Sequence, residues 1–355
     1  MEILNHRGGL VRFRDAVNNK DCVRVGFIGG SITQESAKIN WPDFVAAWVK
    51  NKAIDKPVFI ENIGIGATGS DIAAFRFDWE MADKDCDLIF VEFAVNDESL
   101  DTHLRNRSRE GLVRKILQKT KADIVFVYTY IQDMLPDILA GRVPNSIAEF
   151  ETIAEHYGIG SVWMAKAALD MANDGLVSFE NFLGDGLHPN PLGSSIYAGA
   201  VTQFLDRELK LTSAAAPRET APLFADHWGN ASVIPLDTVK TEGCWYIRSL
   251  YNDDFRYALY TSSLTAKASV TCKCKTMVVC RLHGSRCGMM KYRIDGGAWV
   301  TEEKAVVDWM GGANYPWQSV LIDETEEKEH AVEFMCEKTV RECGSSLYIA
   351  YIGIV

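Results

Sequence analysis

Residues 23–33, VRVGFIGGSIT, join a run of apolar and β-branched residues to a pair of glycines and a serine. Residues 23–28 predict a buried β-strand, and Gly29 and Gly30 allow the backbone to turn tightly and present Ser31. Strand patterns alternate with helical patterns in this way as far as residue 209. Repeated β–α units with short connections predict a parallel sheet with helices on both faces.

The remaining elements of this region are predicted from periodicity and end signals. Strands are expected at 58–60, 88–93, 124–128 and 161–163, and helices from about 42 to 49 and at 71–81, 111–119, 146–156 and 193–209. Ser70 is the expected N-cap of the helix at 71–81. The strand at 88–93 is apolar almost throughout, which is typical of a strand buried on both faces.

The pattern changes after residue 210. Residues 211–221 are rich in Ala, Ser, Thr and Pro, and we expect them to form a linker. Beyond the linker, short strand patterns and a hairpin turn at 295–297 (DGG) predict an all-β sandwich. The sequence therefore predicts an α/β domain at 1–210 and a β-sandwich domain at 222–355.

Composition and charge limit the classes of partner. Hydrophobic residues make up 47% of the 355 residues and the net charge is −11. Because there is no basic stripe, we expect no nucleic-acid partner, and a neutral substrate fits better than a polyanion. No apolar run approaches the length of about 20 residues that spans a bilayer, and residues 1–6 lack the features of a secretory signal. We therefore expect a cytoplasmic protein with no membrane partner.

The cysteines indicate a reducing environment. The chain has nine of them, an odd number, and we expect reduced thiols rather than a disulfide framework. Cys272, Cys274, Cys280 and Cys287 do not have the spacing of a zinc ribbon, and no histidine accompanies them at ligand spacing. No metal site is predicted.

Groups that can do chemistry follow the predicted strands, at the sheet edge where open α/β folds bind ligands. Ser31 is either a nucleophile or a plain turn cap. Asn96, after the strand at 88–93, can donate a hydrogen bond to a developing negative charge or simply favour a turn. In the segment DGLHPN (185–190), Asp185 precedes His188 by three residues and can orient its imidazole.

The glycines after the second strand permit a competing interpretation. Gly64, Gly66 and Gly69 have the G-x-G-x-x-G spacing of a dinucleotide-binding turn, and Glu92 could supply the acid that binds a ribose. A nicotinamide-dependent oxidoreductase would, however, carry this fingerprint after its first strand, where the chain has Ser31 instead. The same glycines can offer backbone N–H groups to an oxyanion.

Taken in order, the Ser, Gly, Asn and Asp-x-x-His segments resemble the SGNH (GDSL-like) hydrolase family over roughly residues 20–210. The GGSIT form of the first segment and RGGL at 7–10 resemble a branch that includes carbohydrate esterases with an extra β-sandwich domain. The resemblance implies a flavodoxin-like three-layer α/β/α sandwich with a parallel sheet, followed by the all-β sandwich domain. It implies a catalytic role for 1–210 and a carbohydrate-binding-like role for 222–355.

The resemblance also implies roles for single residues. Ser31 is the nucleophile, His188 is its base and Asp185 orients that base. The oxyanion hole consists of the backbone N–H of Ser31, the side chain of Asn96 and an N–H of the glycine segment.

The glycine segment departs from the family's pattern. Aligned on Asn62, the position that usually holds glycine is Ala67, so the donor is either Ala67 or Gly66. The first segment has Gly30 where many relatives have Asp, which removes a side-chain contact but no catalytic group.

The function implied is a serine esterase that removes small acyl groups, chiefly acetyl, from carbohydrates through an acyl-enzyme and without a metal or organic cofactor. A lipase or thioesterase and a non-catalytic glycan-binding protein are alternatives. Trp309 and Trp317 are candidates for the substrate cleft, although most aromatic residues of this half are expected in the sandwich core. The sequence does not determine which sugar is the substrate, which position is acylated, or whether the protein forms a homo-oligomer.

Overall fold

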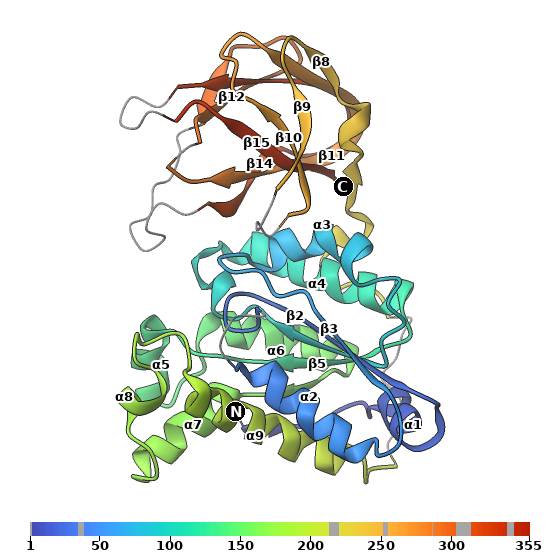
Figure 1. Ribbon diagram of the computed structural model, residues 1–355, viewed down its shortest axis with the longest axis vertical. Coiled ribbons are helices and arrows are strands. Elements are labelled where there is room, and N and C mark those ends of the chain that lie inside the picture. The colour runs from blue at the N-terminus through green and yellow to red at the C-terminus, as the bar shows by residue number, and fades with distance from the viewer. Residues whose placement is uncertain are drawn as a thin grey trace. The chain divides into compact units, whose positions relative to one another are not determined.

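The chain folds into two compact units, Met1–Gly229 and Asn230–Val355 (Figure 1). This computed structural model describes residues 2–34, 39–212, 220–250, 255–285, 287–302, 314–338 and 344–355. Among the described residues, no helix combines the length and the apolar character needed to cross a membrane.

A mostly parallel sheet forms the centre of the first unit. Within the described residues its strand order is β1-β6-β5-β4-β2-β3. The strands are β1 (Leu4–Asn5), β2 (Val23–Gly29), β3 (Val58–Asn62), β4 (Leu88–Glu92), β5 (Asp123–Val127) and β6 (Gly160–Val162). The pairs from β3 to β6 are parallel and β1 is antiparallel to β6. Apart from β1, this is the flavodoxin-like order, so the predicted fold class of this domain is confirmed.

Helices cover both faces of this sheet, as Figure 1 shows for α3 and α4 on one face and α2 and α9 on the other. The helices are α1 (Val11–Asn19), α2 (Trp41–Lys52), α3 (Ser70–Glu80), α4 (Thr102–Lys119), α5 (Leu135–Leu139), α6 (Asn145–Tyr157), α7 (Met164–Asn173), α8 (Phe179–Phe182) and α9 (Pro191–Glu208), with the short 3₁₀ turns η1 (Asn96–Ser99) and η2 (Gln132–Met134). β4 is buried along its whole length, as its apolar sequence predicts.

The strand order reverses between β2 and β4, and this point locates the site. The chain leaves β2 toward β3 on one side, and returns to β4 on the other side of β2. Loops after these two strands therefore diverge and leave a crevice at their carboxyl ends, which is where open α/β sheets bind ligands. Ser31 follows β2 and Asn96 follows β4.

The expected capping role of Ser70 is wrong. Gly69 is the N-cap of α3, and Ser70 is the first helical residue. The Ser70 N–H donates to Oδ1 of Asp97 at 2.8 Å, so a carboxylate from the loop after β4 satisfies this helix end. A tertiary contact has replaced the local cap.

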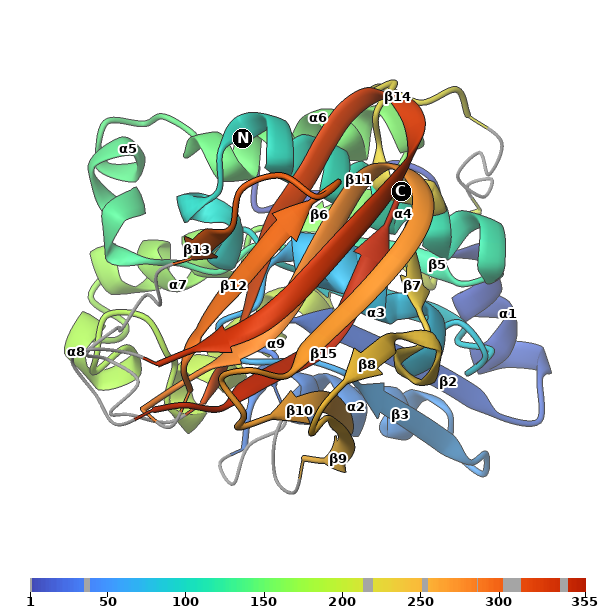
Figure 2. The same cartoon turned by 90° about the horizontal axis from the view of Figure 1, so that it is seen from above.

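The described strands of the second unit all pair in antiparallel fashion, which confirms the predicted all-β class. Within the described residues, its main strand path is β13-β12-β14-β11-β15-β10-β9, with β7 on β15 and β8 on β11. Figure 2 shows the long strands β11, β14 and β15 running side by side. The bounds are β7 (Ser232–Ile234), β8 (Lys240–Glu242), β9 (Tyr246–Ser249), β10 (Tyr257–Thr261), β11 (Lys267–His283), β12 (Met289–Ile294), β13 (Val300–Glu302), β14 (Tyr315–Glu337) and β15 (Leu347–Ile354), with the 3₁₀ turn η4 (Leu236–Thr238). The 3₁₀ turn η3 (Trp228–Asn230) lies where the first unit ends and the second begins. The predicted turn joins β12 to β13, and Asp295 and Gly296 there have φ of 52° and 70°.

The segment after the expected linker packs on the first unit. Residues 213–219 of that linker lie outside the described residues. The N–H groups of Leu223 and Phe224 donate to Glu110 on α4 at 2.6 and 2.7 Å. The guanidinium of Arg107 lies over the buried ring of Trp228. These contacts place 220–229 with the α/β unit rather than with the β unit that follows.

Candidate active site

Ser31 lies in a tight turn at the carboxyl end of β2. The turn is closed by hydrogen bonds from the N–H groups of Thr33 and Gln34 to the Gly30 carbonyl, at 3.1 and 2.9 Å. The Ser31 hydroxyl lies 2.8 Å from Nε2 of His188, which is 157 residues away in the sequence. The sequence therefore builds a nucleophile–base pair from two distant segments.

Asp185 completes a hydrogen-bonded series. The Nδ1–H of His188 donates to Oδ2 of Asp185 at 2.8 Å. Oδ1 of the same carboxylate accepts the N–H groups of Leu187 and His188 at 2.9 and 2.7 Å. Gly186 has φ of 77°, a left-handed conformation that glycine adopts without strain. One carboxylate thus orients the imidazole and also folds the turn that carries it.

The end of this turn is fixed by the start of α9. Asn190 is the N-cap, and its side chain accepts the N–H of Gly193 at 3.0 Å. Its Nδ2–H donates to the Asn181 carbonyl at 2.6 Å. Pro191 occupies the first helical position, where its missing N–H is harmless. His188 is therefore held between two short, anchored segments.

Hydrogen bonds set the charge state of the Asp185 carboxylate. Partial burial works to raise the pKa of Asp185, but the hydrogen bonds from the ring and the N–H of His188, together with that from Leu187, lower it below its ordinary value. The carboxyl group is thus ionised at neutral pH. More than half of the side chain is exposed, so solvent screens its charge.

Asn96 lies against the nucleophile turn. A Cβ atom placed on Gly30 would lie 1.9 Å from Oδ1 of Asn96, so glycine leaves the space that the amide occupies. The following residue, Asp97, is fully buried and accepts Arg109 Nε–H at 2.7 Å. The Arg109 and Ser70 contacts with Asp97 fix the loop from which Asn96 projects.

The glycine segment approaches the same turn. Asn62 donates from Nδ2 to the Thr33 carbonyl at 2.7 Å. A Cβ atom on Gly64 would lie 2.6 Å from the backbone nitrogen of Gln34. Gly64 therefore packs against protein backbone, and Cβ atoms on Gly66 and Gly69 would meet the side chains of Gln34 and Asp97. The space beside these glycines is filled by the protein itself, whereas a dinucleotide needs an open cradle. The fully buried Glu92 is likewise unavailable to a ribose.

The two candidate oxyanion donors in this segment differ in their contacts. The Gly66 N–H donates to the side-chain oxygen of Gln34 at 2.9 Å, so this group is already engaged. Ala67 has φ of 58°, a left-handed conformation that is strained for alanine. The sequence did not indicate a role for Gln34, because only the folded chain brings it to Gly66.

Of the two tryptophans predicted for the substrate cleft, one is described by the structure, and it belongs to the second unit. Trp309 lies outside the described residues. Trp317 belongs to β14 in the second unit, where the residue is 40% exposed and its ring stacks on that of His283 with centroids 5.6 Å apart.

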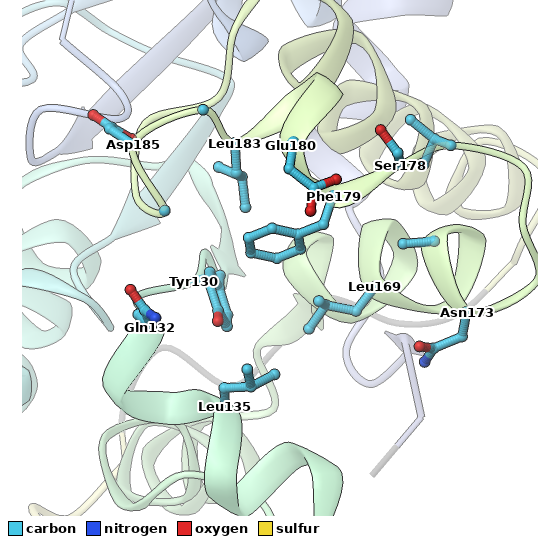
Figure 3. Close-up of a pocket in the computed structure, with 14 residues that line it drawn as sticks. Tyr130, Gln132, Leu135, Leu169, Asn173, Ser178, Phe179, Glu180, Leu183 and Asp185 are labelled. Atoms are coloured by element: carbon cyan, nitrogen blue, oxygen red, sulfur yellow. The ribbon is translucent and has the colours of Figure 1, made fainter.

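A pocket of about 660 Å³ opens beside the Asp185 turn. Asp185 and Gly186 form part of its wall, and Figure 3 shows the side chains of Tyr130 and Phe179 directed into it. Amide and carboxylate groups, among them Gln132 and Glu180, and aliphatic side chains such as Leu135 and Leu169 complete the lining. The pocket therefore combines aromatic surface with polar groups.

The fold and this arrangement define the first unit as a flavodoxin-like α/β domain whose polar site lies where the strand order reverses. Residues 27–196 match the model of the GDSL-like Lipase/Acylhydrolase family. The family resemblance predicted from the sequence is confirmed. Comparison with curated protein sequences finds none that matches.

Two similar solved structures span nearly the whole chain. Both are of a two-domain esterase active on acetylated mannans. One has a TM-score of 0.85 and 24% identity and covers 99% of this chain and 96% of that one. The other was co-crystallised with mannopentaose and has a TM-score of 0.83, 22% identity and the same coverage. At this identity the likeness establishes a shared two-domain fold.

Proposed function

We propose that this protein is a serine esterase that removes small acyl groups, acetyl above all, from carbohydrates. The observation that carries the proposal is the series Ser31–His188–Asp185, with 2.8 Å at each of its two hydrogen bonds. A serine hydroxyl is a weak nucleophile until a positioned base takes its proton.

In the proposed reaction, Ser31 Oγ attacks the ester carbonyl carbon while its proton passes to Nε2 of His188. The tetrahedral intermediate collapses, the C–O bond to the sugar breaks, and the imidazolium gives its proton to the departing alkoxide. Water then loses a proton to Nε2 as its oxygen attacks the acyl-enzyme carbonyl. The second tetrahedral intermediate collapses, the bond between the acyl carbon and Ser31 Oγ breaks, and Oγ takes the proton back from Nε2 as the acid leaves. Asp185 keeps the proton on Nδ1, so that Nε2 can act as the acceptor. No metal or organic cofactor takes part.

Three donors would hold the oxyanion: the N–H of Ser31, the Asn96 side-chain amide and an N–H of the glycine segment. For the third donor we propose Ala67, because the Gly66 N–H is engaged by Gln34. Such donors act on the charge that develops in the transition state, where they are worth most.

Three observations favour an acetylated, neutral sugar as substrate. The net charge of −11 disfavours polyanions. Aromatic, amide and carboxylate groups in the pocket beside Asp185 are the kinds of group that contact sugar rings and hydroxyls (Figure 3). The two similar structures come from an enzyme described as active on acetylated mannans.

The domain roles are part of the proposal. The α/β region, 1–210 in the sequence-based division, would carry catalysis. The β region, from 222 onward in that division, would contribute to glycan binding. Trp317 offers an exposed aromatic surface for that purpose, and the same role is predicted for Trp309.

The test is acetate release from acetylated manno- and xylo-oligosaccharides, measured beside p-nitrophenyl esters of two, four and eight carbons. We expect acetate release that Ser31→Ala abolishes, and a preference for the two-carbon ester. Preference for the eight-carbon ester would favour the lipase alternative. If a folded protein hydrolyses no ester, the esterase proposal is wrong, and glycan binding without catalysis becomes the better explanation.

A further inference from the structure

A carboxyl group is buried beneath the turn that presents Ser31. Glu92 is the last residue of β4 and has no exposed surface. Its Oε2 accepts the hydroxyl of Thr33 at 3.0 Å, and its Oε1 accepts the hydroxyl of Thr129 at 2.7 Å. The backbone N–H of Gly30 also donates to it. Gly30 and Thr33 stand on either side of Ser31, so Glu92 holds the nucleophile turn at two points.

The surroundings of Glu92 control its charge. Burial raises the pKa of Glu92 to about 7 and the nearby Asp97 carboxylate adds to the increase, while the hydrogen bonds from Thr129, Thr33 and Gly30 lower it. Asp97, in the loop after the same strand, is itself paired with Arg109. Tyr197, on α9, interacts electrostatically with Glu92. Burial first, and then the charge of Glu92, raise the pKa of the Tyr197 hydroxyl, so this hydroxyl stays neutral.

We propose that Glu92 is a positioning residue for the esterase reaction, and that the nucleophile turn takes its working geometry when this carboxyl group is ionised. The proposal rests on the function proposed above. Glu92 contacts the turn rather than the substrate, so its effect is on the placement of Ser31 and of the Ser31 N–H.

The hydrogen-bond directions explain why ionisation matters. The Thr33 oxygen lies 3.3 Å from Trp41 Nε1 and accepts its N–H, so the Thr33 hydroxyl proton is free to point at Glu92. Gly30 and Thr129 also donate, and an ionised carboxylate accepts all three bonds. A protonated carboxyl group carries a donor of its own, so one of the three bonds must either break or, at a threonine hydroxyl, reverse its direction. Protonation thereby loosens the turn.

This arrangement predicts a particular pH dependence. The reaction needs an unprotonated base and, under this proposal, an ionised Glu92. The acid limb of log kcat/KM should therefore be steeper than a single ionisation allows. Glu92→Gln removes the second ionisation, so its acid limb should have the slope of one group, and its kcat should fall about tenfold because the amide offers one acceptor fewer.

Thr129→Val gives an independent prediction with a defined sign. The valine keeps the shape of threonine and removes one donor that stabilises the ionised form, so the pKa of Glu92 should rise. The midpoint of the acid limb should move to higher pH, while the plateau of kcat at alkaline pH stays near that of wild type. A purely structural role for Thr129 would lower the rate at every pH alike.

A matched control comes from Glu110 on α4. It is also fully buried, and it accepts three donors: the N–H groups of Leu223 and Phe224 and the hydroxyl of Tyr157. Glu110→Gln should lower the melting temperature but leave the pH profile unchanged.

The experiment measures kcat and KM for p-nitrophenyl acetate from pH 5 to 9 with wild type, Glu92→Gln, Thr129→Val and Glu110→Gln. A single-group acid limb for Glu92→Gln, together with an alkaline shift for Thr129→Val, supports the proposal. Profiles that superimpose on wild type overturn it, and an unshifted Thr129→Val does so even if Glu92→Gln does not fold. If wild type hydrolyses no ester, or if Ser31→Ala is as active as wild type, the proposed function itself has failed.

Discussion

Replacing Asp185 by asparagine tests the orientation of the base with little change in shape. The asparagine oxygen can still accept the N–H groups of Leu187 and His188, which the carboxylate accepts at 2.9 and 2.7 Å. Its NH₂ group would then face Nδ1 of His188 and donate to it. The imidazole would have to carry its proton on Nε2, where it cannot accept the proton of Ser31.

The size of the loss follows from the contacts. A hydrogen bond to a charged group contributes about 1.5–3 kcal/mol, and the forced change of tautomer costs about one further neutral hydrogen bond, near 1 kcal/mol. Solvent screens the exposed carboxylate, so a total of about 3 kcal/mol is reasonable, which is roughly a hundredfold loss in kcat. His188→Ala removes the base itself and should cost at least about 10⁴-fold.

The assay is the steady-state rate with p-nitrophenyl acetate, read as p-nitrophenolate release. The second unit offers a matched control, because Asp295 accepts Nδ1–H of His330 at 2.9 Å and the Ala331 N–H at 2.8 Å. Asp295→Asn should leave kcat unchanged. Equal losses for Asp185→Asn and His188→Ala, or a near-wild-type rate for Asp185→Asn, would refute the assigned roles.

Four further results are expected. Asn96→Ala should fold normally and lose about a hundred- to a thousandfold in kcat, and a near-wild-type rate would remove Asn96 from the oxyanion hole. Gly30→Ala should lower kcat by displacing the Asn96 amide while the melting temperature changes little; unchanged kinetics would count against that contact. Ala67→Gly should keep activity and raise stability by up to about 1 kcal/mol, because φ of 58° strains alanine, and a lower melting temperature would contradict this. Burial raises the pKa of Glu92 from 4.5, its ordinary value in the unfolded chain, to about 7 in the folded protein. The contribution of this group to the unfolding free energy, of the order of 3 kcal/mol, is therefore present below pH 4.5 and lost as the pH rises through 7. The unfolding free energy of Glu92→Gln should lack this decline.

The sequence predicts the α/β framework well because that framework is local in origin. Strand β2 and the glycine turn after it follow from an apolar run that ends in Gly29-Gly30. The turn at Asp185 forms from hydrogen bonds within four residues, so the spacing of Asp185 and His188 is informative by itself. The contact between Ser31 and His188 then follows from the fold.

The parts that the sequence does not predict depend on tertiary contacts. Ser70 looks like a helix cap, but Asp97 from another loop satisfies the end of α3. Gln34 meets Gly66 only when the loops after β2 and β3 come together. For Glu92 a signal did exist, since a single acid in an otherwise apolar strand must find partners when it is buried. In the competing oxidoreductase interpretation this acid would bind a ribose, whereas in the structure it contacts the nucleophile turn.

The most direct test of the central claim is covalent labelling of Ser31. A fluorophosphonate transfers its phosphonyl group to an activated serine and releases fluoride, and intact mass with peptide mapping locates the adduct. We predict one adduct per chain, on Ser31, in wild type and in Ser195→Ala. The hydroxyl of Ser195 donates to the Leu192 carbonyl within α9. Ser31→Ala should remain unlabelled. An adduct that persists in Ser31→Ala, or no adduct on a wild-type protein that hydrolyses esters, would contradict the assignment of Ser31 as the nucleophile.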